Sequence, residues 1–300
     1  MIAANVLLLK PSPSIFLKSE RVKQYFNSKL RENIKTALHN SGERGFSLEQ
    51  GRGRLFLRSA DIKKSSEVLR RVFGLHSLAP AFEFSAGTLQ EIVDNSLGFA
   101  EGRFENIKTF AVRASRSGEQ AFTSQELERK LGAELLSWFL HLKVDLTKPE
   151  KTFFLELRGE KGYCYVEEIP CFGGLPQGVE GFVGVFFEGK PEELVAGWLL
   201  MKRGCNIFPI VPRTTKKMEK HLSALVPWNR GMRFSLTPQG KLSALAEERG
   251  LSALARADTA VTKKAFKEYR AFDSKMPLPV FRPLLFHSAE WVKKAASTIK

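Results

Sequence analysis

The sequence predicts an α/β and α+β multidomain protein, and three observations support that prediction. A chain of 300 residues exceeds the usual size of one domain, about 100–200 residues. Residues 1–75 alternate strand and helix patterns in the order β-α-β-α, which is typical of a small α+β layer. From residue 182 onward, apolar strands alternate with helices, as in a doubly wound sheet.

The N-terminal third begins with an apolar strand pattern at Val6–Leu9. Ser19 is placed to cap a helix whose apolar side chains recur every four residues over Val22–Leu38. Residues 40–53 are polar and contain glycine, so we expect a turn there. A half-buried strand is expected at Arg54–Arg58, and a second helix follows it.

The middle third is predicted to contain two strand–helix pairs and a hairpin. The strand at Phe110–Ala114 places Arg113 opposite its apolar face, and we expect Arg116, on or just beyond the strand, to lie opposite that face too. Thr123 and Glu126 have the spacing of a capping box at the start of a helix. The hairpin is expected over residues 153–166.

The last third begins with a continuous apolar run, Phe182–Phe187, typical of a buried parallel strand. A loop at Glu188–Glu193 leads into a helix expected over Leu194–Arg203. Further strands are expected at Arg233–Leu236 and 251–255, with helices between them and one at the end. This alternation predicts a parallel sheet covered on both faces.

Charge is concentrated at the two ends of the chain. The net charge is +15, with +9 on residues 1–75, −4 on 76–175 and +10 on 176–300. So strong a positive charge favours a polyanionic partner, usually nucleic acid. The alternative is a solvated basic surface without a partner.

Cysteine and histidine patterns predict no metal or disulfide chemistry. Three cysteines, Cys164, Cys171 and Cys205, have no zinc spacing and fit a reducing compartment. The five histidines are widely separated. The first residues show no signal-peptide pattern, and no apolar run reaches the length of a membrane span. We therefore expect a cytoplasmic protein with small buried thiols and no membrane contact.

Four segments of the middle third form one recognisable pattern: Phe110–Arg116, Phe122–Ser124, Leu131-Gly132 and Val144–Leu146. They resemble a THUMP domain, an RNA-binding fold. Further characteristic segments occur in the rest of the chain: Leu17-Lys18, Phe26, Asn33-Ile34, Gly53-Arg54, Val72–Gly74, Gly173–Pro176, Leu199–Gly204 and Leu278–Leu284. Together, and in this order along the chain, these segments resemble the tRNA 4-thiouridine synthetase family. The resemblance implies an N-terminal ferredoxin-like domain at 1–76, a THUMP domain at 77–172 and a Rossmann-like PP-loop domain at 173–300.

The nucleotide loop departs from the family pattern. The family's Ser-Gly-Gly-x-Asp-Ser motif lets backbone N–H groups close on the pyrophosphate of ATP. In an ungapped alignment it falls on Glu188, Gly189, Lys190, Pro191, Glu192 and Glu193, so only Gly189 is kept. Cys205 does not match the family's catalytic cysteine. The sequence therefore predicts no ATP cofactor, a degenerate loop and no catalytic residue; Glu192 and Glu193 are interpreted as helix-start charges.

Basic side chains on strands and helix starts are the candidate RNA-binding residues, since arginine and lysine contact phosphate oxygens. These are Lys18, Arg21, Arg52, Arg54, Arg113 and Arg116. For each of them the alternative is a solvated surface charge.

The resulting hypothesis is a non-catalytic tRNA-capture or adaptor protein in tRNA modification. Its expected partners are tRNA and a tRNA-modifying enzyme, and the resemblance also implies a homodimer. One alternative is an active tRNA thiolation enzyme that binds ATP through a rebuilt loop. A second is a protein–protein scaffold that uses the former nucleotide face.

Overall fold

The computed structural model describes residues 2–51, 53–118, 120–238 and 242–299. The chain forms two compact units that interleave along the sequence. Unit 1 contains the residues up to Lys10, then Gly45–Ser66 and Ser77–Pro170. Unit 2 contains Pro11–Arg44, Glu67–His76 and the chain from Cys171 onward. Because the units interleave, the domain boundaries at residues 76 and 172 stay a prediction.

Unit 1 is built on one mixed sheet with the strand order β2-β3-β1-β4-β8-β7-β5-β6, and β9 pairs with β4. Its strands are β1 (Val6–Pro11), β2 (Ser47–Gly51), β3 (Arg54–Arg58), β4 (Leu75–Ser85), β5 (Thr109–Ser117), β6 (Lys143–Val144), β7 (Lys151–Arg158), β8 (Lys161–Tyr165) and β9 (Ile169–Pro170). Strands β5 and β7 are parallel, whereas β7 and β8 form the expected antiparallel hairpin.

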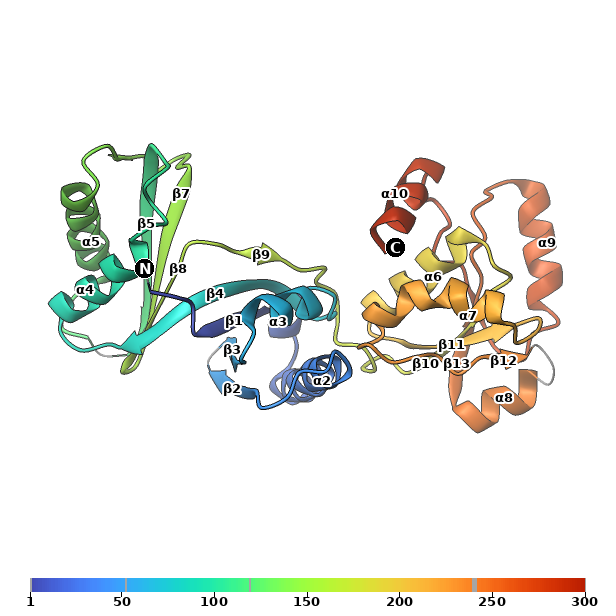
Figure 1. Ribbon diagram of the computed structural model, residues 1–300. Coiled ribbons are helices and arrows are strands. Elements are labelled where there is room, and N and C mark those ends of the chain that lie inside the picture. The colour runs from blue at the N-terminus through green and yellow to red at the C-terminus, as the bar shows by residue number, and fades with distance from the viewer. Residues whose placement is uncertain (1, 52, 119, 239–241, 300) are drawn as a thin grey trace. The chain divides into compact units, whose positions relative to one another are not determined.

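Two helices, α4 (Leu89–Ala100) and α5 (Ser124–Trp138), cover one face of the β5–β7–β8 part of this sheet (Figure 1). Each begins with a capping box, Thr88 with Glu91 and Thr123 with Glu126. The capping box predicted at Thr123 is therefore confirmed. The buried leucines of α5 pack with phenylalanines of the strands into one core.

Unit 2 contains a parallel sheet with the strand order β12-β11-β10-β13-β14. Its strands are β10 (Phe182–Phe186), β11 (Asn206–Val211), β12 (Thr237–Pro238), β13 (Leu251–Ala255) and β14 (Val280–Phe281). Strand β10 comes first in sequence yet lies in the middle, between β11 and β13. This arrangement creates a topological switch point at the carboxyl end of β10, where doubly wound folds bind ligands.

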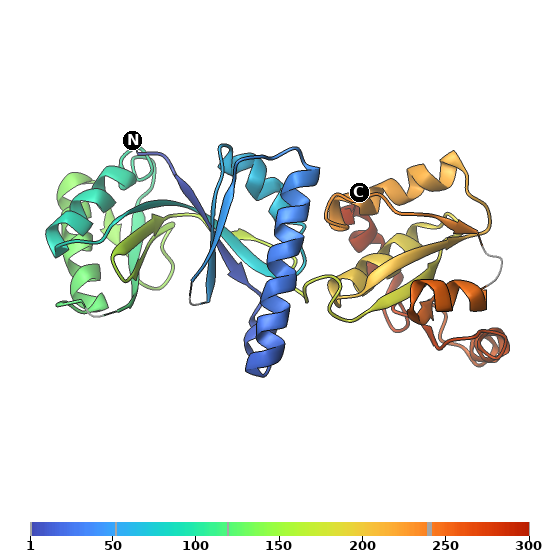
Figure 2. The same ribbon diagram turned by 90° about the horizontal axis from the view of Figure 1, so that it is seen from below.

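Helices cover both faces of the parallel sheet. The core on one face includes α6 (Pro191–Lys202), α7 (Lys216–Leu222), the 3₁₀ helix at Ser223–Trp228 and α10 (Ala289–Ile299). The other face packs against α8 (Leu242–Arg249) and α9 (Lys263–Asp273). Figure 2 shows α8, in orange, in front of the yellow strands. The predicted combination of α+β and α/β folds is confirmed.

The remaining helices precede this sheet in the chain. They are α1 (Pro13–Phe16), α2 (Glu20–Asn40) and α3 (Ile62–Leu69). In unit 2, the buried Asn33 of α2 donates to the carbonyl of Gln177 at 3.0 Å and accepts from Arg230 at 3.1 Å. These contacts hold α2 against the segment that leads into β10.

Three local expectations are corrected by the structure. No strand forms at Arg233–Leu236, because Phe234 and Leu236 pack against the core from an irregular segment; pairing begins at Thr237. The polar stretch at 40–53 contains β2, an exposed strand paired with β3. Helix α6 begins at Pro191, three residues earlier than expected, because proline suits the first helical position.

Candidate functional site

A cavity of about 430 Å³ lies at the carboxyl ends of β10 and β13, at the switch point of the parallel sheet. The loop before α6 contributes one wall, and the segment after β13 together with α9 contributes the others. Its charged lining residues are Glu188, Lys190, Glu192, Glu193, Arg256, Asp258 and Glu268. The predicted nucleotide loop therefore lies where an α/β fold places a ligand.

The carboxylate of Glu193 occupies the inside of this loop. Its Oε2 accepts from the backbone N–H groups of Glu188, Gly189 and Lys190 at 2.8, 2.9 and 3.0 Å. Gly189 has a φ of +105°, a left-handed conformation that glycine adopts without strain. With Pro191 at the first helical position, Glu193 falls at the third, where a glutamate reaches back to the loop. Three converging N–H donors are thus satisfied by a carboxylate of the same chain.

The pKa values of two glutamates in this loop are shifted in opposite directions. Burial raises the pKa of Glu193, the three N–H donors lower it in part, and nearby Glu188 raises it again, so it lies above its ordinary value. Glu188 is exposed and pairs with Lys190 at 2.7 Å, and this contact holds its pKa below the ordinary value. Lys190 therefore neutralises Glu188, and Glu193 depends on backbone dipoles.

Two arginines near the cavity also form ion pairs with carboxylates of the same chain. Arg256 pairs with Asp258 at 3.3 Å and lies over the ring of Phe272. Arg282, behind the lining residues, bridges Asp258 at 2.9 Å and Asp273 at 2.7 Å. These contacts leave both guanidinium groups partly neutralised within the protein.

Binding of ATP in the manner of a PP-loop requires that the backbone N–H groups of this loop are free to donate to a phosphate. The described residues do not fit that requirement, because the Glu193 carboxylate holds the three donors. Burial also raises the pKa of the Cys205 thiol, which makes it a weaker nucleophile at neutral pH. Burial likewise raises the pKa values of the Cys164 and Cys171 thiols, that of Cys171 to about 12.

Among the residues that the structure describes, no group of three or more His, Cys, Asp or Glu side chains could hold a metal ion. Within the same ranges, no helix is long and apolar enough to cross a bilayer.

Comparison with known proteins identifies the parts of the chain. Residues 86–167 match the THUMP domain, and residues 13–79 match the ThiI ferredoxin-like domain. The chain is 36% identical over 200 residues to a "Probable tRNA sulfurtransferase" of Saccharolobus solfataricus, an alignment that covers 66% of this chain and 52% of the relative. The chain contains a THUMP domain and is similar in sequence to the tRNA sulfurtransferases.

A second relative, the "Probable tRNA sulfurtransferase" of Methanothermobacter thermautotrophicus, is 30% identical over 250 residues, or 79% of this chain and 62% of the relative. The chain thus spans between about half and two thirds of these curated relatives' length.

Solved structures confirm the fold. The crystal structure of PH1313 from Pyrococcus horikoshii aligns with a TM-score of 0.85 at 25% identity, covering 98% of this chain and 99% of that one. A 4-thiouridine synthetase–RNA complex with bound ATP aligns with a TM-score of 0.84 at 22% identity, covering 98% and 84%. The THUMP domain, the ferredoxin-like domain and the Rossmann-like sheet are therefore present as predicted.

Two of the predicted RNA-binding residues lie near each other at the start of α2. Lys18 is exposed in the turn between α1 and α2, and Arg21 is exposed in the first turn of α2. Both belong to unit 2, whereas Arg113 and Arg116 belong to unit 1. Arg52 lies outside the described residues.

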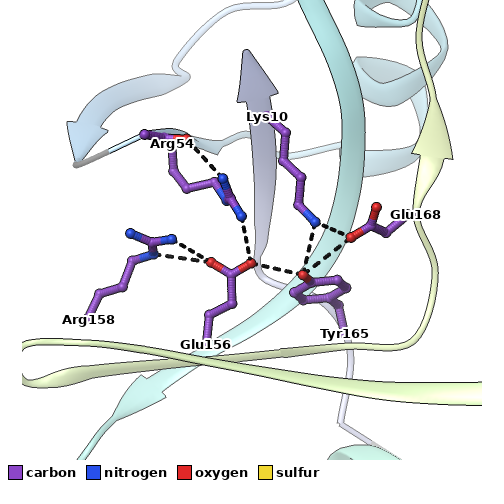
Figure 3. A network of polar contacts seen from close by, with 7 residues as sticks. Lys10, Arg54, Glu156, Arg158, Tyr165 and Glu168 are labelled. Atoms are coloured by element: carbon purple, nitrogen blue, oxygen red, sulfur yellow. Dashed lines mark hydrogen bonds and ion pairs between the residues drawn. The ribbon is translucent and has the colours of Figure 1, made fainter. Parts of the chain in front are cut away.

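Arg54 is placed differently from a surface cation. It is half-buried, and its guanidinium pairs with the buried carboxylate of Glu156 at 3.2 Å, which also binds Arg158 at 2.7 Å (Figure 3). The hydroxyl of Tyr165 donates to the same carboxylate at 2.9 Å, and Lys10 donates to that hydroxyl at 3.2 Å. Strands β1, β3, β7 and β8 are thereby joined by one polar network.

Arg113 and Arg116 do not share a face of β5. Three positions apart on a strand, they point to opposite sides. Arg116 follows the alternation of the apolar residues, beyond the core, and donates to the carbonyl of Gln120 at 3.2 Å. Arg113 is exposed and donates to the carbonyl of Leu146 at 2.7 Å. The expectation that both lie opposite the apolar face is wrong because β5 continues to Ser117.

Sequence analysis missed two features that the structure shows. Glu156 had a signal, since a carboxylate inside an apolar strand needs a buried partner. Lys202 and Arg203, at the end of α6, gave none, because basic residues at a helix C-terminus complement its dipole in any protein.

Proposed function

We propose that this protein binds tRNA and does not transfer sulfur to it, acting as a capture or adaptor protein in tRNA modification. The observation that carries the proposal is the Glu193 carboxylate, which accepts from the three N–H groups available for a phosphate. A polyphosphate at that position would have to displace a buried anion. The raised pKa of Cys205 further supports a role without a reactive thiolate.

Similarity to known proteins, net charge and exposed cations together support the binding half of the proposal. The chain contains a THUMP domain, its relatives are named tRNA sulfurtransferases, and one structural neighbour is a complex with RNA. The net charge of +15 favours a polyanion. Exposed Lys18, Arg21 and Arg113 provide cations for phosphate contacts.

A second candidate is an ATP-dependent modification enzyme with a rebuilt loop. The observation that favours it is the cavity of about 430 Å³ at the switch point, with Arg256 and Tyr269 in its lining. In that case the Glu193 side chain moves out of the loop when nucleotide enters.

Titrations of ATP and of tRNA into the same protein preparation distinguish the two candidate functions. We expect no heat of binding on titration with ATP and Mg²⁺, and tRNA affinity that falls steeply as salt rises. ATP binding in the micromolar range would contradict the non-catalytic proposal. Absence of salt-dependent tRNA binding would contradict the proposal that the chain captures tRNA.

A further inference from the structure

A second cavity of about 430 Å³ lies in unit 2, away from the β10 loop, and three segments form it. These are α1 with the turn after it, the linker before β10 and the C-terminal end of α6. The residues that line it are Ser14, Leu17, Lys18, Gly174, Leu175, Leu199, Lys202 and Arg203. We call this cavity the basic groove.

Hydrogen bonds between the segments hold the groove in shape. The N–H of Leu175 donates to the carbonyl of Lys202 at 3.0 Å, and the hydroxyl of Ser14 donates to the carbonyl of Gly174 at 3.5 Å. A Cβ at Gly174 would lie 2.3 Å from the carbonyl oxygen of Lys202, and φ there is +80°. Only glycine allows this approach, so the groove is preformed rather than a gap between loose segments.

The groove contains three cations and no carboxylate. Lys18, Lys202 and Arg203 line it, and no ion pair joins any of them to an acidic residue in the part of the chain that the structure describes. The ammonium group of Lys202 lies 5.1 Å from the ring centroid of Trp198. Burial without a compensating carboxylate lowers the pKa of Lys202.

Helix-dipole compensation accounts for only part of this arrangement. Cations at the C-terminal end of α6 stabilise the helix through its dipole. That effect requires neither partial burial of Lys202 nor the approach of Lys18 from a separate segment. Three cations that converge without an internal anion are arranged for an external one.

We propose that the basic groove binds the phosphodiester backbone of RNA, with Lys18, Lys202 and Arg203 contacting successive phosphates. The inference rests on the proposed tRNA binding and adds a binding surface to it. RNA fits better than a single free phosphate because three cations line one cavity, and successive phosphates of one backbone can engage all of them. Leu17, 86% exposed at its rim, offers an apolar contact for a ribose or base between phosphates.

The test compares two variants that each remove two positive charges from unit 2. K202Q/R203Q changes the groove, and K293Q/K294Q removes adjacent exposed lysines from α10. tRNA affinity is measured against salt for the wild-type protein and both variants. Each lost phosphate contact lowers the slope of log affinity against log salt by about 0.7–0.9. The groove variant is therefore expected to lose about 1.4–1.8 from the slope, and the α10 variant much less.

Each outcome has a defined meaning. Equal slopes for the two double variants would overturn the groove while leaving tRNA binding intact. A wild-type protein without salt-dependent tRNA binding would instead overturn the proposed function. Lys18→Gln, at an exposed turn, provides a second variant whose slope should fall by about 0.7–0.9. Competition by polyglutamate or inorganic phosphate as strong as that by tRNA would contradict RNA as the ligand.

Discussion

The buried carboxylates of Glu156 in unit 1 and Glu193 in unit 2 are satisfied in different ways. In unit 1, Glu156 is bound by the side chains of Arg54 and Arg158, and these ion pairs outweigh burial and hold its pKa below the ordinary value. In unit 2, Glu193 is bound by backbone N–H groups alone, and burial keeps its pKa above the ordinary value. The first is a full ion pair, the second an anion held by dipoles.

The difference in how they are bound indicates a different role for each carboxylate. The ion pair between Arg54 and Glu156 connects β3 with β7, and Tyr165 and Lys10 extend the contacts to β8 and β1, so this network belongs to the scaffold of unit 1. The N–H groups that bind Glu193 form a concave set at the switch point of the sheet, where phosphates bind in related folds. Under the proposed function, the internal carboxylate occupies the N–H donors that a phosphate would use.

The largest expected effect is on the ion-pair network. Glu156→Ala leaves Arg54 and Arg158 without their carboxylate, and removing one partner of a buried pair costs about 3 kcal/mol. Urea unfolding measures the change in the free energy of unfolding. Arg113→Ala, at an exposed position of β5, serves as the control and should change stability by less than about 0.5 kcal/mol. Equal effects of the two variants would contradict the scaffold role.

A smaller effect is expected at the loop. Glu193→Ala removes a helix-start carboxylate that accepts three N–H bonds, which should cost about 2 kcal/mol. Glu193→Gln keeps one acceptor oxygen at the same place and should cost less. The two variants are compared by thermal unfolding in phosphate-free buffer. A larger loss for Gln than for Ala would contradict the hydrogen-bonding role of this side chain.

The two carboxylates should also respond oppositely to pH. Glu156 has a lowered pKa in the folded state, so its stabilisation is present above about pH 4.3, its unfolded value, and is lost as pH falls through the folded pKa. Glu193 has a raised pKa, so the folded state favours its protonated form and loses stability as pH rises through the folded pKa.

Unfolding free energies measured from pH 3 upward check these signs, with the glutamine variants as references. Glu156→Gln should flatten the acid side of the wild-type profile. Glu193→Gln should remove the decline above the ordinary glutamate pKa of about 4.3. A change of the same sign in both variants would contradict the comparison.

Local patterns predicted much of the fold and less of the site. The capping box at Thr123 and the strand at Arg54–Arg58 depend on near neighbours, so sequence spacing was sufficient. The partner of Arg54 lies 102 positions away, and no local pattern shows it. Likewise the loop residues were identified, but the direction of the Glu193 side chain depends on where α6 begins.

The basic groove shows the same limit. A charge pattern in the first third of the chain predicts Lys18 as an RNA contact, whereas Lys202 and Arg203 lie in the last third. Only the fold within unit 2 brings these positions to one cavity. Net charge predicted the class of partner, whereas its point of contact required the three-dimensional structure.

The most direct test asks whether the Glu193 carboxylate holds the place of a bound phosphate. Melting temperature is measured with increasing inorganic phosphate, at constant ionic strength, for the wild-type protein, Glu193→Ala and Glu193→Gln. Phosphate should raise the melting temperature of the alanine variant, whose three N–H donors are free, and leave the other two proteins unchanged. Equal stabilisation of the wild-type protein would contradict the account, because the loop would then accept an anion with Glu193 in place.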